Sequence, residues 1–191
     1  MVTRLQANSL LILLLVTLVA AGCGATGQVD QGRVIAYDRQ TQRATVIREA
    51  DQKASYGILP PVVVRAPENP EEMGPVPSPG KLIQLDTKAR HIVIYDAAVQ
   101  EFRTIPYTVV SERRNIAKSP AAPVIDRVAK TITIYSAAEK TLITFAASDD
   151  LLALPADTWR PGDVVRYYYK EPGQALRMMN VTKTDLSKSG G

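Results

Sequence analysis

The chain has 191 residues, of which 46% are hydrophobic, 22% charged and 6% aromatic, with one cysteine and one histidine. This composition excludes a disordered chain, a collagen-like fibre and a disulfide-stapled miniprotein. A single Cys and a single His leave no Cys/His zinc site and no disulfide within the chain. The formal net charge of +4 is too small to favour non-specific binding of nucleic acid, so we expect no nucleic-acid partner.

The first 22 residues have the form of a secretory signal peptide. Arg4 and the free amine give a positive start, and an apolar run over residues 10–21 follows, broken only by Thr17. Twelve residues are fewer than the ~20 that cross a bilayer as a helix. We therefore expect residues 1–22 to be cleaved and to take no part in the fold.

Residues 18–23 resemble the bacterial lipobox, in which small residues precede a cysteine that is acylated and becomes the mature N-terminus. Ala20 stands where the lipobox more often has leucine. The resemblance implies that Cys23 carries acyl chains, and two or more chains anchor a protein stably to a membrane. Gly24 follows the cysteine, where enteric lipoproteins retained in the inner membrane have aspartate. The resemblance therefore implies a lipid-anchored protein of the outer membrane that faces the periplasm.

Beyond a short polar tether over residues 23–30, the chain has the alternating pattern of β-strands. Three segments share one form, in which an apolar run ends in aspartate and a long polar side chain follows four residues later. This spacing predicts a strand, a short polar turn and a second strand in each segment. The aspartates are Asp38, Asp86 and Asp126, and the polar residues are Gln42, Arg90 and Lys130.

An internal repeat extends this pattern. Residues 89–105 and 129–145 align without gaps at an offset of 40 and have identical residues at seven positions. The offset predicts a repeated hairpin. A β-propeller would need at least four blades, and three unequal copies are too few.

The expected fold is all-β, with two small β units. Residues 31–118 are expected to form the first unit, interrupted by a proline-rich loop over residues 66–80 that holds five prolines. Residues 119–191 are expected to form a five-stranded OB-like barrel with a short helix over residues 148–154. Its strands are expected at residues 122–126, 131–136, 141–147, 163–170 and 175–183. The combination of lipobox and OB-like hairpin repeats resembles bacterial lipoproteins of the kind classed as domains of unknown function.

The densest aromatic cluster, Tyr167 to Tyr169, predicts a candidate binding surface. Alternation along a strand places Arg166, Tyr168 and Lys170 on one exposed face. OB-folds bind oligonucleotides or oligosaccharides on such basic and aromatic faces. In an envelope protein the ligand would be a glycan or an anionic lipid headgroup. The alternative is an ordinary solvated sheet face.

Other candidate groups each have a plain structural alternative. The only histidine is expected on the exposed face of its strand, and the thioethers could hold Cu(I) beside it, or could simply fill the core. We favour no metal and no cofactor. A small basic run could bind lipid phosphates, or could be an ordinary polar loop. The proline-rich loop with its glutamates could bind a partner, or could only link two strands. These residues are His91, Met73, Met178, Met179 and Trp159 for copper, Arg113, Arg114 and Lys118 for the basic run, and Glu68, Glu71 and Glu72 in the loop.

The sequence contains no local motif that pairs a nucleophile with a base and no Gly-rich turn before a helix, so we expect no enzyme. We expect an accessory or scaffolding protein of an envelope complex, anchored to the membrane through its acyl chains and bound to another envelope protein. The alternative is a module that binds a glycan or an anionic lipid.

Overall fold

A computed structural model describes residues 26–49, 60–117, 121–137 and 139–184, and most of their regular structure is β. Twelve strands form three antiparallel sheets, which confirms the all-β class. Within these ranges, no helix is long and apolar enough to cross a membrane. The expected signal peptide, Cys23 and the last seven residues lie outside the described part of the chain.

The N-terminal and C-terminal segments together form a five-stranded sheet, in which β1 is the central strand. Antiparallel ladders join β1 to β2 along one edge and to β11 along the other. Small and β-branched residues alternate inward and pack under the sheet, among them Val34, Val46 and Val165. In spatial order the strands are β12 (Arg177–Asn180), β11 (Val164–Tyr169), β1 (Gln28–Asp38), β2 (Arg43–Arg48) and β3 (Val62–Arg65).

The middle of the chain forms a β sandwich from the other two sheets. A short helix and a 3-10 turn close one end of this sandwich, and a second 3-10 turn lies in the proline-rich segment. The three-stranded sheet contains β4 (Leu82–Asp86), β5 (His91–Asp96) and β6 (Glu101–Pro106), and the four-stranded sheet contains β7 (Val109–Arg113), β10 (Thr141–Ala146), β9 (Thr131–Ser136) and β8 (Val124–Asp126); the helices are η1 (Pro70–Glu72), α2 (Asp149–Ala153) and η2 (Ala156–Trp159).

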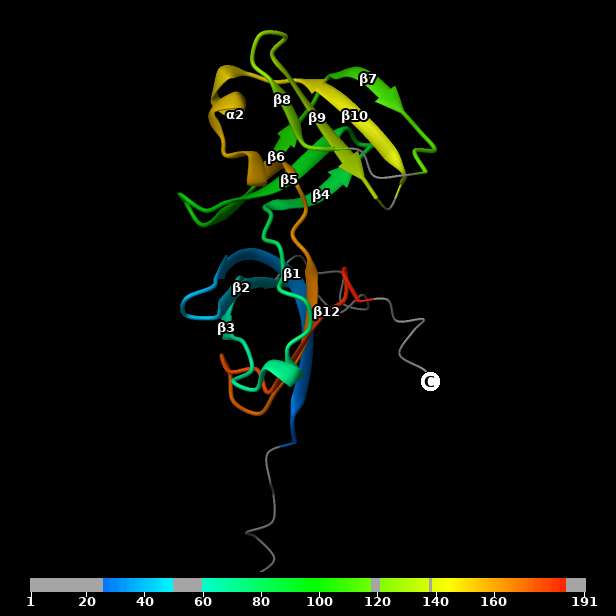
Figure 1. Cartoon of the computed structure of the whole chain (residues 1–191). Coiled ribbons are helices and arrows are strands. Elements are labelled where there is room, and N and C mark those ends of the chain that lie inside the picture. The colour runs from blue at the N-terminus through cyan, green and yellow to red at the C-terminus, as the bar shows by residue number, and fades with distance from the viewer. Residues whose placement is uncertain (1–25, 50–59, 118–120, 138, 185–191) are drawn as a thin grey trace, which may run out of the picture.

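The sandwich is an insertion between β3 and β11 (Figure 1). The chain leaves the five-stranded sheet before residue 81 and returns to it after residue 160, so that two units lie one above the other. We refer to them as the sheet unit and the sandwich unit. The structure thus replaces the expected division at residue 118, which falls between β7 and β8 inside the sandwich unit.

The expected OB-like barrel over residues 119–191 is wrong. The strands near residues 163–170 and 175–183 exist, but β11 pairs with β1 and not with β10, because the eleven-residue β1 offers both of its edges. None of the three described sheets closes into a barrel. The two outer edges of the five-stranded sheet are linked only through single bridges to neighbouring loops, Arg65 to Gln174 and Met73 to Met178.

The sequence repeat corresponds to two matching meanders, β4-β5-β6 and β8-β9-β10, which belong to the two facing sheets of the sandwich. Residues at equivalent repeat positions meet in one core, together with Phe145 and Trp159, whose ring centroids are 5.7 Å apart. The equivalent pairs are Ile92 with Ile132 and Ile94 with Ile134, and all four are fully buried.

The repeated Asp-to-polar spacing reflects one turn geometry. The Asp86 carboxylate accepts hydrogen bonds from the backbone N–H groups of Lys88 and Ala89 at 2.9 and 2.7 Å, and Asp126 does the same two and three residues on. The fourth residue after each aspartate closes the turn in the left-handed region. The φ angles there are 53° at Gln42 and Arg90 and 51° at Lys130. The aspartate spacing therefore predicted the turns correctly, although the residues with positive φ are not glycines.

Substitution of Gln100 tests this turn geometry. Gln100 closes the β5–β6 turn with φ 58°, where a side chain costs roughly 1–2 kcal/mol and glycine costs little. Because glycine also loses more chain entropy on folding, we expect Gln100→Gly to raise the free energy of unfolding by about 0.5–1 kcal/mol in urea titrations. Val99→Gly, one residue earlier, should lower it; a loss of stability in both variants would contradict the assignment.

Candidate functional site

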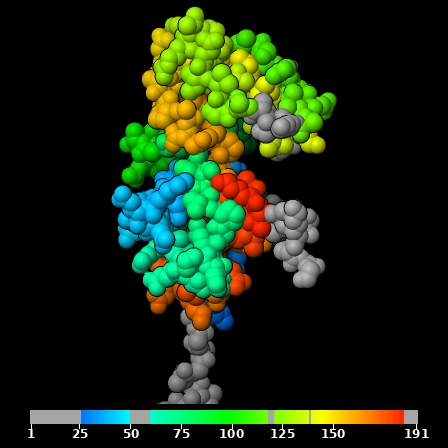
Figure 2. All heavy atoms as spheres, viewed as in Figure 1, coloured from blue at the N-terminus to red at the C-terminus, as the bar shows by residue number. Residues whose placement is uncertain are grey.

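A cleft of about 580 Å³ opens where the sheet unit meets the sandwich unit. Both units contribute to its walls: β1 and the entry to β11 on one side, β4 and the end of β9 on the other. In Figure 2 the sandwich unit overhangs the C-terminal segment, drawn in red. Clefts of this size at the junction of two units are the usual place for ligand sites. The lining residues are Arg33, Leu82, Ile83, Gln84, Leu85, Tyr135, Ser136, Ala137, Pro161, Gly162, Asp163 and Thr182.

A smaller hollow of about 140 Å³ lies beside the cleft and shares Tyr135, Ala137 and Pro161 with it. Trp159 also lines this hollow, and it is the only tryptophan of the chain. Its fluorescence is therefore a reporter placed next to the cleft.

Two segments of the chain cross from one unit to the other and form the floor of the cleft. Each crossing contains a Pro-Gly pair, Pro79-Gly80 on the way out and Pro161-Gly162 on the way back. The Gly80 N–H donates to the carbonyl of Val34, at 3.1 Å. A Cβ on Gly162 would collide with that same Val34 carbonyl, so the close approach requires glycine there. The crossing segments also pair with each other, since the Leu82 N–H donates to the Arg160 carbonyl at 3.1 Å.

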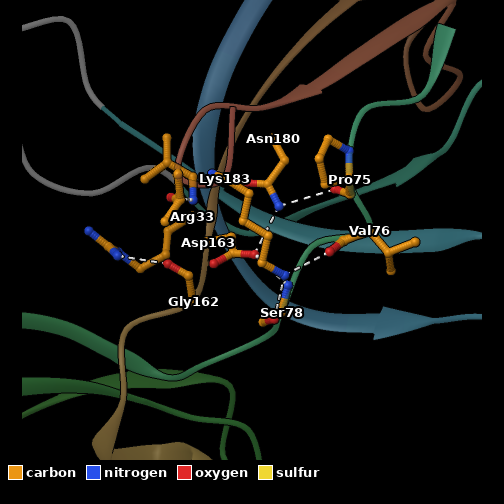
Figure 3. A network of polar contacts seen from close by, with 10 residues as sticks. Arg33, Pro75, Val76, Ser78, Gly162, Asp163, Asn180 and Lys183 are labelled. Carbon is orange, nitrogen blue, oxygen red and sulfur yellow. Dashed lines mark hydrogen bonds and ion pairs between the residues drawn. The ribbon is translucent and has the colours of Figure 1, made fainter. Parts of the chain in front are cut away.

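A buried carboxylate beside the crossings gathers several donors (Figure 3). Asp163 Oδ2 accepts from the Ser78 N–H at 2.7 Å and from Asn180 Nδ2 at 2.9 Å, and forms an ion pair with Lys183 Nζ at 3.0 Å. Lys183 and Asn180 also donate to the carbonyls of Val76 and Pro75, at 2.9 and 3.1 Å. The proline-rich segment is therefore fixed against β11 and β12.

These donors decide the charge of Asp163. Burial alone would raise the pKa of this carboxyl, but the Ser78 N–H, the Asn180 amide and the Lys183 ammonium together hold the pKa below its usual value. Asp163 is thus an ionised group whose Oδ2 holds three donors together, which suits a structural role.

Arg33 points toward the cleft with fewer partners. Its Nη1 donates to the Gly162 carbonyl at 2.9 Å, and it forms no ion pair with any described carboxylate. Burial lowers the pKa of Arg33, and the charge of Glu49 partly offsets this. A guanidinium nevertheless stays protonated in proteins. The cleft therefore presents a half-buried positive charge.

The predicted surface of Arg166, Tyr168 and Lys170 lies along β11 and the residue after it. Arg166 is exposed, and its Nε and Nη2 donate to Gln31 Oε1 at 3.1 and 2.9 Å. Tyr168 is half-buried, because its ring lies against the backbone of Gly27, where a Cβ would collide with it. Arg166 and Tyr168 share the outer face of the sheet, with Gln31 and Val29 opposite them on β1.

The copper candidates are not brought together. Met73 and Met178 meet through a backbone bridge in the sheet unit, whereas Trp159 lies in the sandwich core. His91 lies half-buried on the outer face of β5 as predicted, opposite Asp86. No group of three or more residues with His, Cys or carboxylate ligands that could hold a metal occurs in the described ranges.

The other two candidates differ in outcome. Arg113 and Arg114 are exposed, and Arg114 donates to Glu112, while Lys118 lies outside the described residues. The proline-rich loop is not a free extended segment: it contains η1, and Glu72 pairs with Arg177 of β12.

Sequence reasoning missed the cleft because its parts lie up to about 150 residues apart. Arg33, Tyr135 and Thr182 meet only through the pairing of β1 with β11 and the insertion of the sandwich. The one local signal was the pair of Pro-Gly dipeptides, each at a crossing.

Comparison with known proteins gives one family. The family described as "Domain of unknown function (DUF4881)" matches residues 25–189. No curated protein and no solved structure matches the chain.

Removal of the Asp163 carboxylate tests the network. We expect Asp163→Ala to lower the free energy of unfolding by about 2–4 kcal/mol, because it leaves buried donors and the Lys183 charge without their acceptor. Since the folded pKa of Asp163 lies below 3.8, its contribution is complete above about pH 4 and is lost as the pH falls through the folded pKa. Urea titrations at pH 7 and pH 3 measure this.

The matched variant is Asp163→Asn, which keeps the shape. Its deficit relative to the wild type should be smaller at pH 3 than at pH 7, because the wild type begins to lose the contribution of the charge below about pH 4. An equal deficit at both pH values would show that the charge of Asp163 does not stabilise the fold.

Proposed function

We propose that this chain, which belongs to the family described as a domain of unknown function (DUF4881), is a lipid-anchored protein of the bacterial cell envelope that binds a ligand or a partner segment in the junction cleft. The observation that carries the proposal is the cleft itself, built by both units around the half-buried Arg33. The proposed place is the outer membrane, with the two units facing the periplasm.

The anchor rests on the lipobox-like segment that ends in Cys23. β1 begins at Gln28, only five residues later, so the intervening chain reaches at most about 17 Å. Figure 1 shows that β1 begins at the end of the sheet unit farthest from the sandwich unit. An acylated Cys23 would therefore hold the sheet unit near the bilayer and project the sandwich unit away from it.

Binding fits the groups around the cleft better than catalysis. Its polar lining groups Arg33, Gln84 and Ser136 can all donate hydrogen bonds, and much of the remaining wall is apolar. Asp163 is the one carboxylate among the described lining residues, and the donors on its Oδ2 keep it ionised. A general acid or base works best with a pKa near the working pH, and the lowered pKa of Asp163 makes it a poor acid and a weak base.

One observation favours the second candidate, a surface of Arg166, Tyr168 and Lys170 for a glycan or an anionic lipid headgroup. Tyr168 lies against Gly27, four residues from Cys23. An anchored chain would keep this surface close to the headgroups. Tyr168 could stack one ring face on a sugar, although the backbone of Gly27 covers part of the ring.

The anchor is tested with Cys23→Ser. We expect the wild type to sediment with membranes and to yield an N-terminal Cys23 peptide whose mass includes two or three acyl chains. Cys23→Ser should lack this modification and lose stable membrane attachment. An unmodified Cys23 in the wild type would overturn the anchored part of the proposal.

The cleft is tested with Ala137→Phe, which fills the wall shared by the cleft and the hollow beside Trp159. Ala129→Phe is the control, because Ala129 is exposed in the β8–β9 turn and lines neither hollow. Full-length protein purified from envelopes should carry a non-covalent ligand or a bound partner segment in native mass spectra. Ala137→Phe should lose it, and Ala129→Phe should keep it.

Retention by Ala137→Phe combined with loss in Tyr168→Ala would move the site to the second candidate surface. Retention in both variants would overturn both assignments.

A further inference from the structure

Arg33 carries a half-buried charge that forms no ion pair with a described carboxylate, although the charge of Glu49 acts on it from farther away. Burying a cation is costly unless it is paired. The described ion pairs engage other basic residues around the junction, such as Lys81 with Asp157 and Lys183 with Asp163. Among the described residues, the one hydrogen-bond partner of the Arg33 side chain is the neutral carbonyl of Gly162. The remaining donors of its guanidinium are thus available to an anion.

A second cation lies on the same face. Arg33 and Gln31 are two residues apart on β1, and Arg166 lies directly opposite Gln31. Arg33 and Arg166 are therefore diagonal neighbours, a separation of roughly 7–8 Å between backbone positions. One carboxylate, Glu49, approaches this pair, and it accepts from Gln31 Nε2 at 3.3 Å. On this face of the sheet two cations thus stand against the one carboxylate of Glu49, and the carboxylate that lines the cleft, Asp163, is paired with Lys183.

The opposite wall is mainly apolar. Ile83 and Leu85 of β4 and the ring of Tyr135 line it, while Pro161 lies at the floor. Gln84 and Ser136 add single polar groups. A ligand that fits both walls would have a negative group at one end and an apolar body at the other.

We propose that the junction cleft takes an amphipathic organic anion, a carboxylate or a phosphate, whose charged group pairs with Arg33 and whose apolar part lies along Ile83, Leu85 and Tyr135. This inference rests on the proposed function of the cleft as a binding site. Arg33 suits it, because a guanidinium binds carboxylate and phosphate with two parallel hydrogen bonds. A volume of about 580 Å³ accommodates such a molecule.

The experiment uses full-length protein in a nonionic detergent and four probes: 4-phenylbutyrate, 4-phenylbutyl phosphate, the neutral 4-phenylbutanol and inorganic phosphate. Binding is followed by Trp159 fluorescence and by titration calorimetry. The variants are Arg33→Gln and the matched Arg127→Gln, since Arg127 is exposed in the β8–β9 turn. The detergent is the same throughout, so partition into micelles cancels between variants.

We expect the two anionic amphiphiles to bind the wild type and Arg127→Gln at least about tenfold more tightly than Arg33→Gln, as for a charge-assisted hydrogen-bonded pair. The alcohol should bind more weakly and equally to all three, and inorganic phosphate should bind weakly because it lacks the apolar part. The tighter of the two anionic probes identifies the headgroup. Thermal unfolding checks that Arg33→Gln is folded. If this variant does not fold, the test is a salt titration of the wild type: added salt must weaken the binding of the anionic probes and leave the binding of the alcohol unchanged.

The outcomes separate the two proposals. Equal binding of the anions and the alcohol, with no effect of Arg33→Gln but a loss in Ala137→Phe, would leave the cleft a binding site and overturn the anion assignment. Absence of binding by every probe, with no adduct or partner lost in Ala137→Phe, would overturn both.

Discussion

The two units are held in one arrangement by the pairing of the segments that run between them. Val34 lies at the centre of this crossing: its N–H donates to the Asp163 carbonyl at 2.9 Å, and its own carbonyl accepts from Gly80. The two Pro-Gly pairs place backbone where a side chain would collide. Asp163 then adds its carboxylate to the same point and fixes the proline-rich segment. Because β1 supplies Val34 at the crossing and Arg33 next to it, the position of the cleft depends directly on these contacts.

Insertion of a repeated sandwich onto a single sheet makes the two repeats inequivalent. Tyr95 and Tyr135 occupy the same repeat position, but Tyr95 is buried with Ile35 and Ile47 of the sheet unit. Tyr135 instead lines the cleft and donates to the Ile116 carbonyl at 3.2 Å. One meander therefore serves as the contact between the units, and the end of the other forms a wall of the cleft. The asymmetry that creates the cleft arises from docking, since the two repeats keep closely similar core residues.

Local sequence patterns were sufficient to predict the strands and turns, but not to predict which strands pair with one another. Alternation and the Asp spacing identified the hairpins, because each turn is decided by four or five adjacent residues, such as Asp86 to Arg90. The pairing of β1 with β11 joins residues more than 130 apart, as in Arg33 and Val164, and alternation is the same whichever strand lies alongside. The barrel prediction failed for this reason. The alternation correctly placed Arg166 and Tyr168 on one face. The contact of Tyr168 with Gly27 depends on the pairing of β1 with β11, which the local pattern does not reveal.

The geometry of β1 connects the two parts of the proposed function. Gln28, at the start of the strand, lies five residues from Cys23, and Arg33 lies five residues further on in the same continuous strand. At about 3.4 Å per residue, roughly 17 Å separate the start of β1 from the cleft. An acylated Cys23 would therefore hold the cleft within a few tens of ångströms of the bilayer surface, through a strand paired on both edges. The apolar part of an amphipathic anion favours the membrane and its charge favours the aqueous side, so the anchor would place the cleft near one source of the ligand proposed for Arg33.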